Sequence, residues 1–217
     1  MENNTTINVT LDEAKEWFNS GNATLKEIAL QAFDKDELTY NFKKITTFKK
    51  ACEALGYNYN TTMTCVNHIA TFSKASAAMF KLNIIRKALN SGQDMSLTKD
   101  PEDSYIYYPY NPFVTKSSTY YKSEINSGKM EVIGKIKSKG EEYNVLGGSA
   151  SHGGDAGLGL FFSHHGVGGA NANVGYLGCA NEEIAKHFGK YFGMLITEAK
   201  FGDLDGFEII ERKYGNA

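Results

Sequence analysis

Two short segments near the amino terminus carry apolar residues at helical spacing. Thr10 to Glu13 reads Thr-Leu-Asp-Glu, a capping box in which the threonine and glutamate side chains each bind the other's backbone N–H group. Thr24 to Glu27 repeats the pattern as Thr-Leu-Lys-Glu. Each capping box precedes apolar residues three and four positions apart. We therefore predict a helical hairpin over residues 1–42, packed by Trp17 and Phe33.

Further helices are predicted in the middle of the chain. Residues 45–56 form a short amphipathic pattern that begins with two threonines and ends at a glycine. Residues 57–62 are polar and predict a loop. A longer helix follows from Val66 or Ser73 to Leu89, and its many alanines indicate a well-buried position. His68, near the predicted start of this helix, is interpreted as a capping or packing residue.

The last predicted helix follows the polar sequence Asn181-Glu182-Glu183. Asn181 can cap it, and the two glutamates suit the positive end of the helix dipole. Gly189 and Gly193 are unusual inside a helix and predict a close approach to another element. Beyond Phe201 the chain is polar, and no element is predicted there.

Strands are predicted between these helices. Residues 104–113 are dense in aromatic residues and contain two of the three prolines, which favours a strand at an edge or a strand end. This strand is interpreted either as cover for the core or as an aromatic platform for a flat ligand. Further strands are predicted at Tyr120–Tyr121, 130–136 and 143–146, with a polar turn at 138–142.

The stretch from Val145 to Cys179 breaks these patterns. It contains half of the 22 glycines, and from Tyr143 to Asn181 the only charged residue is Asp155. Each interior glycine costs a helix about 0.5–1 kcal/mol relative to alanine, so a helix is excluded. Leucine, phenylalanine and valine recur through the stretch, unlike in a plain glycine-serine linker. We predict short strands and tight loops here, within an α+β ligand-display domain over residues 43–217.

The composition excludes several classes of protein. The formal net charge is −2 and the basic residues are scattered, so no nucleic acid is expected as a partner. No apolar run approaches the roughly 20 residues that cross a bilayer, so no membrane is expected either. The amino terminus has no signal-peptide pattern, and synthesis in the cytoplasm is expected. Three cysteines without metal-type spacing, Cys52, Cys65 and Cys179, predict no disulfide framework.

The glycine-rich stretch also lacks the motifs of the common cofactor and metal sites. It contains no lysine and neither of the glycine patterns that bind phosphates, so no nucleotide site is expected. Its three histidines and one aspartate are potential ligands of a transition metal, but no H-E-x-x-H or H-x-H pattern fixes a geometry. Adjacent histidines on a strand point to opposite faces. We predict neither a cofactor nor a metal site.

A catalytic nucleophile is conceivable only at Ser151 or Cys179, with His152 as the base. No G-x-S-x-G elbow surrounds the serine, and small apolar neighbours indicate that Cys179 is buried. The sequence therefore predicts a protein without catalytic residues. A hydrolase or a metal enzyme remains a third hypothesis, to be judged by metal content and by loss of an activity when His152 or Cys179 is changed.

The amino acids absent from the stretch point to sequence variation. From Tyr143 to Asn181 there is no lysine, glutamate, glutamine, methionine or tryptophan. Every residue type present in this segment has a codon that differs from an A-A-pyrimidine codon of asparagine only at the two adenines. The five absent types have no such codon. The alternative explanation is a glycine-rich segment of low complexity that excludes these residues by chance.

Two motifs frame the stretch and carry a resemblance. Val-Leu-Gly-Gly-Ser at 145–149 and Asn-Ala-Asn-Val-Gly-Tyr-Leu-Gly at 171–178 resemble the frame that closes C-type-lectin-like domains. These C-type-lectin-like domains are of two kinds, the formylglycine-generating type and the variable proteins of diversity-generating retroelements. Leu146 stands where arginine is usual, and Tyr176-Leu177 stand where phenylalanine and arginine are usual. Outside this frame, the helical segments D-E-A-K-E-W-F-N-S-G-N at 12–22, K-L-N-I-I-R-K-A-L-N at 81–90 and E-E-I-A-K-H-F-G-K-Y-F at 182–192 carry a second resemblance. Through them the whole chain resembles an uncharacterised family of proteins from Bacteroides-type bacteria and their phages.

The resemblance implies a non-enzymatic binding surface, with Gly147, Gly148, Asn173 and Gly175 as its frame. The expected partner is a protein or glycan ligand in a phage or prophage setting, and a homo-oligomer or a virion is compatible with it. The alternative is a structural subunit of a virion or other assembly, with the stretch at a subunit interface. The expected ligand-binding residues are Ser149, Ser151, His152, Asp155, Leu158, Leu160, Phe162, His164, His165, Val167 and Asn171.

Overall fold

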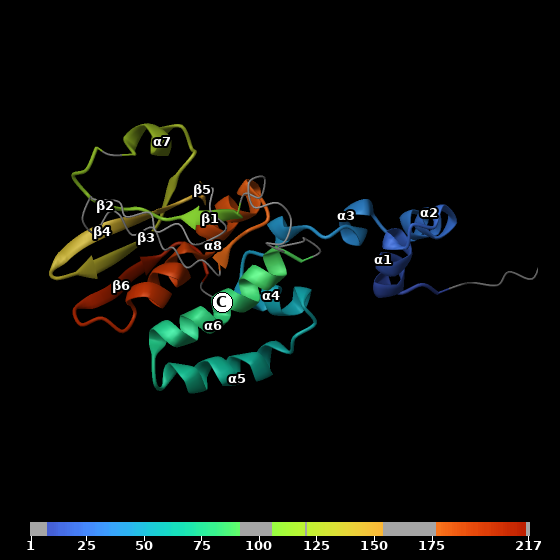
Figure 1. Ribbon diagram of the computed structural model, residues 1–217, viewed down its shortest axis with the longest axis horizontal. Coiled ribbons are helices and arrows are strands. Elements are labelled where there is room, and N and C mark those ends of the chain that lie inside the picture. The colour runs from blue at the N-terminus through green and yellow to red at the C-terminus, as the bar shows by residue number, and fades with distance from the viewer. Residues whose placement is uncertain (1–7, 92–105, 120, 154–176, 216–217) are drawn as a thin grey trace, which may run out of the picture. The chain divides into compact units, whose positions relative to one another are not determined.

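The fold is α+β, with helices at the amino terminus and an antiparallel four-stranded sheet packed against a long helix (Figure 1). The computed structural model describes residues 8–91, 106–119, 121–153 and 177–215. The chain divides into two compact units, residues 1–41 and 42–217.

The amino-terminal unit contains three short helices, α1 (Leu11–Asn19), α2 (Ala23–Ala32) and α3 (Lys35–Leu38). The capping box of Thr10 and Glu13 is present as predicted. The second predicted capping box is wrong, because Asn22 caps α2 by accepting hydrogen bonds from two backbone N–H groups. Asparagine is among the strongest N-caps, so it outcompetes the threonine two residues later. Trp17 and Phe33 pack on a core of Ala14, Ala29 and Leu38.

Three helices open the carboxy-terminal unit after a single turn at Phe42–Lys44. The first is capped by Thr47 and the third by Ser73, as two of the sequence patterns predicted. The predicted polar loop at 57–62 is wrong, since Asn58 caps a helix there. The chain breaks at Thr71–Phe72 instead, so that one predicted helix becomes two and His68 lies at the end of the earlier one. The helices are α4 (Phe48–Ala54), α5 (Tyr59–Ala70) and α6 (Lys74–Leu89).

The strands form two sheets. The four-stranded sheet has the order β2-β4-β3-β6, and the two-stranded sheet pairs β1 with β5. All pairings are antiparallel. Lys139 and Gly140 have positive φ angles and form the tight turn between β3 and β4. The strands are β1 (Ile106–Tyr110), β2 (Phe113–Thr115), β3 (Glu131–Ser138), β4 (Glu141–Gly147), β5 (Ser149–Gly153) and β6 (Phe207–Arg212).

Two predictions about the strands are wrong. Tyr121 is not in a strand: its φ angle of 61° is left-handed, and it precedes the short helix α7 (Lys122–Asn126). The tail beyond Phe201 is not irregular, because β6 pairs with β3 at the sheet edge. Only one face of β6 is partly buried, so its apolar alternation is too short to stand out in the sequence.

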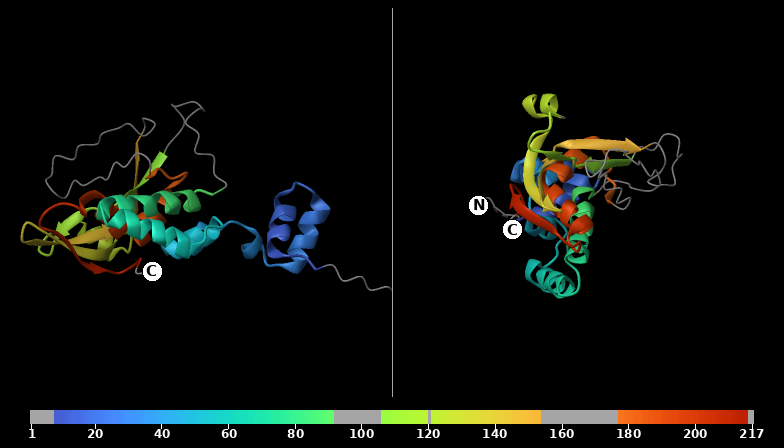
Figure 2. Two further views of the ribbon diagram at one scale, coloured as in Figure 1. Left: turned by 90° about the horizontal axis from the view of Figure 1, so that it is seen from below. Right: turned by 90° about the vertical axis from the view of Figure 1, so that its left-hand side faces the viewer.

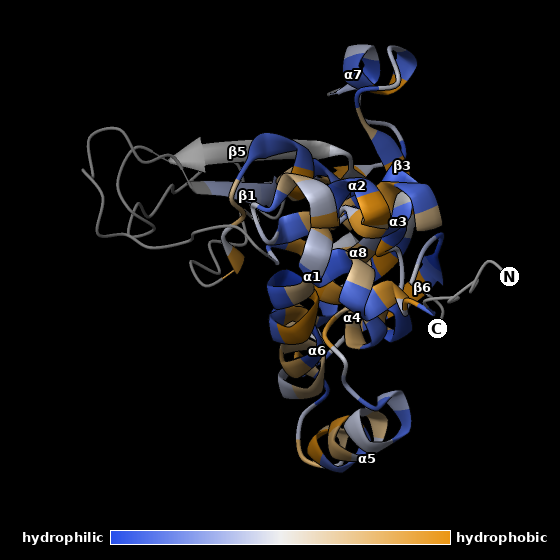
Figure 3. Ribbon diagram, turned by 90° about the vertical axis from the view of Figure 1, so that its right-hand side faces the viewer, coloured by the Kyte–Doolittle hydropathy of each residue, from blue (hydrophilic) through white to orange (hydrophobic). Residues whose placement is uncertain are grey.

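The central element is α8 (Glu182–Phe201), capped by Asn181 as predicted. It contacts β1, β3, β4 and β5 on one side and α6 on the other (Figure 2). In Figure 3, hydrophobic and hydrophilic residues both occur around α5, whose only fully buried residue is Val66. Within the described residues, no helix combines the length and the apolar composition needed to span a membrane.

Candidate functional site

The first part of the predicted binding surface lies on β5. Ser149, Ser151 and His152 belong to this strand, and their backbones pair with those of Tyr110, Tyr108 and Tyr107. The remaining predicted contact residues, and Asn173 and Gly175 of the predicted frame, lie outside the described residues. These contact residues are Asp155, Leu158, Leu160, Phe162, His164, His165, Val167 and Asn171.

The glycine-rich stretch starts from a bend in a two-stranded ribbon. One strand of the ribbon is β1 followed by β2, and the other is β4 followed by β5. The ribbon passes from one sheet to the other at Asn111–Pro112 and at Gly147–Gly148. Gly148 has a φ angle of +99°, which favours glycine. A Cβ atom on Gly147 would lie 2.8 Å from the carbonyl oxygen of Gly189, so α8 packs directly on this bend.

A buried asparagine that the sequence analysis did not identify holds the bend. The Nδ2 group of Asn111 donates hydrogen bonds to the carbonyl oxygens of Leu146, at 2.9 Å, and Gly189, at 2.8 Å. Gly193 makes room for it, since a Cβ atom there would lie 2.4 Å from Asn111 Nδ2. The close approach predicted for the helix glycines is therefore confirmed for Gly193. We call Asn111, Gly147 and the β1–β5 pairing the amino-terminal anchor.

A second buried asparagine holds the point where the described chain resumes. The Nδ2 group of Asn90, at the end of α6, donates to the carbonyl oxygens of Arg86 and Gly178, at 3.0 and 3.2 Å. Its Oδ1 atom accepts a hydrogen bond of 2.8 Å from the N–H group of Ala180. Cys179 is buried and exchanges two backbone hydrogen bonds with Tyr107, of 2.8 and 3.2 Å. We call Asn90 and the Cys179–Tyr107 bridge the carboxy-terminal anchor.

The two anchors meet on one strand. Gly153, the last residue of β5, pairs with Ile106, and Cys179 pairs with Tyr107, the next residue of β1. Gly153 and Cys179 therefore lie beside neighbouring positions of a single strand. Leu146 and Leu177, near the two ends of the stretch, both have fully buried side chains. The described residues at both ends of the stretch thus belong to the hydrophobic core.

The environment of Cys179 argues against nucleophilic catalysis. Its burial raises the pKa of the thiol from 9.0 to about 12, because a thiolate there would lose its hydration. A thiol with this pKa is almost entirely protonated at neutral pH. Among the described residues, no group of three or more histidine, cysteine and acidic side chains is arranged to hold a metal ion.

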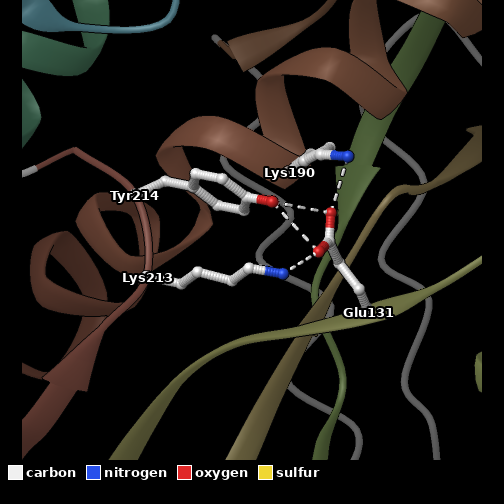
Figure 4. Close-up of polar contacts among 4 residues, drawn as sticks. All are labelled: Glu131, Lys190, Lys213 and Tyr214. Atoms are coloured by element: carbon white, nitrogen blue, oxygen red, sulfur yellow. Dashed lines mark hydrogen bonds and ion pairs between the residues drawn. The ribbon is translucent and has the colours of Figure 1, made fainter.

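A densely paired polar cluster surrounds Glu131 at the start of β3 (Figure 4). Its carboxylate accepts hydrogen bonds from Lys190 at 2.7 Å, from Tyr214 at 3.0 and 3.1 Å, and from Lys213. Burial alone would raise the pKa of Glu131, but these donors outweigh it and hold the pKa below its ordinary value. The carboxylate is therefore committed to joining β3, α8 and the segment after β6.

A pocket of about 310 Å³ adjoins this cluster and reaches Gly147 and Gly148. His187 of α8 borders it, and its Nε2 atom lies 2.7 Å from the carbonyl oxygen of Ile45. Burial lowers the pKa of His187, which keeps the ring neutral. The pocket also contains lysines and glutamates that pair with each other, including Lys186 with Glu183. Its described lining contains four lysines and two glutamates, so positive charge is in excess.

Comparison with known proteins gives no relative on which to base an assignment. No protein-family model, no curated protein and no solved structure matches the chain. The interpretation of the site therefore depends on the motifs at 145–149 and 171–178 and on the geometry of the two anchors.

Proposed function

We propose that the carboxy-terminal unit is a non-enzymatic binding module that presents the glycine-rich stretch to a protein or glycan ligand. The observation that carries the proposal is the position of the two anchors on neighbouring residues of β1. A segment whose ends are held together in the core can change its sequence without disturbing the fold. Binding loops on rigid scaffolds commonly have this arrangement.

The proposal extends to the type of fold and its setting. We infer a C-type-lectin-like domain of the variable-protein kind in a phage- or prophage-associated protein. The framing motifs and the codon-compatible composition between Tyr143 and Asn181 support this inference. Asparagine, serine and histidine recur in the stretch, which also contains one tyrosine, and such side chains provide adaptable hydrogen bonds and contact area at low entropic cost.

The test is a variant that keeps the anchors and removes contact groups. His152, Asp155, Phe162 and His164 are replaced together by alanine, and Asn60, Thr64, Asn67 and Thr71 of the exposed face of α5 and its end are replaced together as a matched control. Labelled full-length protein is applied to a glycan array and to a panel of bacterial cells. We expect binding to a subset of these targets, lost in the first variant and retained in the second, with equal free energies of unfolding.

Two outcomes would refute the proposal. Strong destabilisation of the first variant would indicate that these side chains pack in the core. Unchanged binding by both variants would place the contact surface elsewhere on the molecule.

The second candidate function is a structural subunit of a virion or other assembly. The amino-terminal unit favours it, because its core is small and Ile28 and Leu30 of α2 remain 39% and 43% exposed. Such a hairpin is suited to docking on a larger partner. Sequencing the same locus in sister isolates distinguishes the two candidate functions. Differences confined to 147–172 support variable binding, and an invariant stretch supports assembly.

A further inference from the structure

A second pocket, of about 410 Å³, lies among the helices of the carboxy-terminal unit. None of its lining residues belongs to β1 or β5, so it is distinct from the surface proposed above. Pockets that bind small ligands have volumes in this range and combine apolar walls with a few polar groups. The residues that line it come from α4, α5, α6, α8 and the chain around the end of β6: Phe48, Tyr59, Met63, Lys81, Tyr191, Phe192, Leu195, Glu198, Arg212, Tyr214 and Gly215.

The apolar walls consist of two aromatic pairs. The ring centroids of Phe48 and Tyr59 are 6.1 Å apart, and those of Tyr191 and Tyr214 are 4.9 Å apart. Both pairs are tilted, a geometry that favours further edge and face contacts with an aromatic ring. Met63, an adaptable side chain, also lines the pocket.

The charged groups of the pocket do not balance. Arg212 and Glu198 form an ion pair of 2.6 Å, with each side chain 25% exposed. Lys81 is half-buried, and within the described residues its ammonium group makes no hydrogen bond or ion pair. It lies 5.7 Å from the centroid of the Phe48 ring, which partly compensates its charge. Burial lowers the pKa of Lys81, as expected for a cation that lacks a close partner.

We propose that this pocket binds a small molecule in which an aromatic ring is joined to a carboxylate. The ring occupies the space between the two aromatic pairs, and the carboxylate accepts a hydrogen bond from Lys81. The described residues that line the pocket include one carboxylate and two cations, which leaves one positive charge to neutralise. Arg212 is already paired with Glu198, so the ammonium group of Lys81 is the cation left to bind the carboxylate of the ligand.

The experiment uses the full-length protein labelled with ¹⁵N and 3-phenylpropionate as the probe. We expect the amide signals of the lining residues on α5, α6 and α8 to shift in a saturable manner. The matched probe 2-phenylethylamine, with a similar shape and the opposite charge, should bind at least about tenfold more weakly. An adventitious apolar site would bind both probes alike.

Substitutions identify the group that recognises the carboxylate. Lys81→Met, which keeps an unbranched side chain but removes the charge, should weaken binding of 3-phenylpropionate about tenfold. Lys49→Met on α4 is the control, because Lys49 is an exposed lysine whose nearest ion-pair partner, Glu53, is also exposed. Glu198→Gln should instead tighten binding, since it removes the only carboxylate among the described lining residues and releases Arg212. This opposite effect cannot result from loss of folding.

The proposal is overturned if the lining amides do not shift up to the solubility limit of 3-phenylpropionate. It is also overturned if the two probes bind equally well or if a folded Lys81→Met protein binds like the wild type. If the Lys81→Met protein does not fold, the direction in which Glu198→Gln changes the affinity for 3-phenylpropionate decides the test. Weaker binding by that variant would contradict the assigned charge balance.

Discussion

The two anchors of the glycine-rich stretch each depend on a buried asparagine, but the two amides bind in different ways. Among the described residues, Asn111 in the amino-terminal anchor only donates, to the carbonyl oxygens of Leu146 and Gly189, and its own oxygen has no partner there. Asn90 in the carboxy-terminal anchor donates to two carbonyl oxygens and also accepts from the N–H group of Ala180.

The surroundings of the two asparagine side chains also differ. Around Asn111 the space is created by missing side chains, since Cβ atoms on Gly147 or Gly193 would collide with neighbouring atoms. Asn90 instead follows the last turn of α6 and joins it to an extended segment. The amino-terminal anchor is therefore sensitive to added volume and charge, and the carboxy-terminal anchor to lost hydrogen bonds.

The largest effect is expected from replacing each asparagine by aspartate. In Asn111→Asp both hydrogen bonds are lost, and a buried carboxylate faces two carbonyl oxygens. We expect the free energy of unfolding to fall by about 3–5 kcal/mol. Asn90→Asp keeps an acceptor for Ala180, and the loss should be smaller by about 1–2 kcal/mol. Urea unfolding of both variants at pH 7 measures the difference.

Lowering the pH provides a control for this pair. Protonation of the aspartate restores one donor, so Asn111→Asp should recover part of its lost stability relative to the wild type below the pKa of the new carboxyl group. Equal losses in the two variants, or a larger loss in Asn90→Asp, would contradict the distinction between a donating and a mixed amide.

The next effect is local and is expected from Asn90→Ala. The change leaves the carbonyl oxygen of Gly178 and the N–H group of Ala180 without partners and should cost about 2–3 kcal/mol. Opening of this anchor exposes Cys179, so its alkylation by iodoacetamide at pH 8 should accelerate at least about tenfold. Peptide mass spectrometry measures the rate at each cysteine.

The other two cysteines calibrate the labelling. Cys65 is exposed and reports the intrinsic reaction, whereas Cys52 is buried in the same core as Cys179 and reports global unfolding. Equal acceleration at Cys52 and Cys179 would show that Asn90 supports the whole unit and not this anchor in particular.

A third prediction concerns pH. The pKa of Cys179 is raised from 9.0 to about 12, so the folded state holds the thiol proton more tightly than the unfolded state. The stability contributed by this group is fully present below pH 9 and is lost as the pH rises towards 12. At a pH of about 10.5 we expect a loss of about 2 kcal/mol from this group.

The variant Cys179→Ala isolates this contribution, because the other titrating groups, including Cys52, are common to both proteins. We expect its free energy of unfolding to fall less steeply between pH 9 and 10.5 than that of the wild type. Parallel pH profiles would mean that Cys179 titrates normally, and the carboxy-terminal anchor would then be open to solvent.

Much of the fold could be predicted from capping residues and hydrophobic spacing. The caps at Thr10, Thr47 and Asn181 were correct because each precedes a regular apolar pattern. The first part of the helix α5 was missed because its threonines and asparagines indicate a loop. Its apolar residues Tyr59, Met63, Val66 and Ile69 have helical spacing, and this signal could have identified it.

The candidate site could be predicted only in part. Composition identified the glycine-rich stretch, but neither Asn90 nor Asn111 stands out in the sequence. Asparagine is common in loops, and its burial depends on contacts with residues distant in the chain. Asn90 contacts Gly178 and Asn111 contacts Gly189, at separations that no local pattern encodes. The only local hint at Asn111 is a single amide between Tyr110 and Pro112.

The smallest effect distinguishes two tyrosines of β1, Tyr108 and Tyr110, which both pair with β5 in the amino-terminal anchor. The hydroxyl of Tyr110, which pairs with Ser149 in the amino-terminal anchor, lies 2.6 Å from that of Tyr121, and Tyr110→Phe should cost about 0.5–1.5 kcal/mol. Within the described residues, the hydroxyl of Tyr108 is buried without a hydrogen-bond partner, so Tyr108→Phe should be neutral or stabilising. Thermal unfolding of both variants measures this contrast in sign. A loss of stability in Tyr108→Phe would mean that its hydroxyl has a partner in solution, and the amino-terminal anchor would then include a further polar contact.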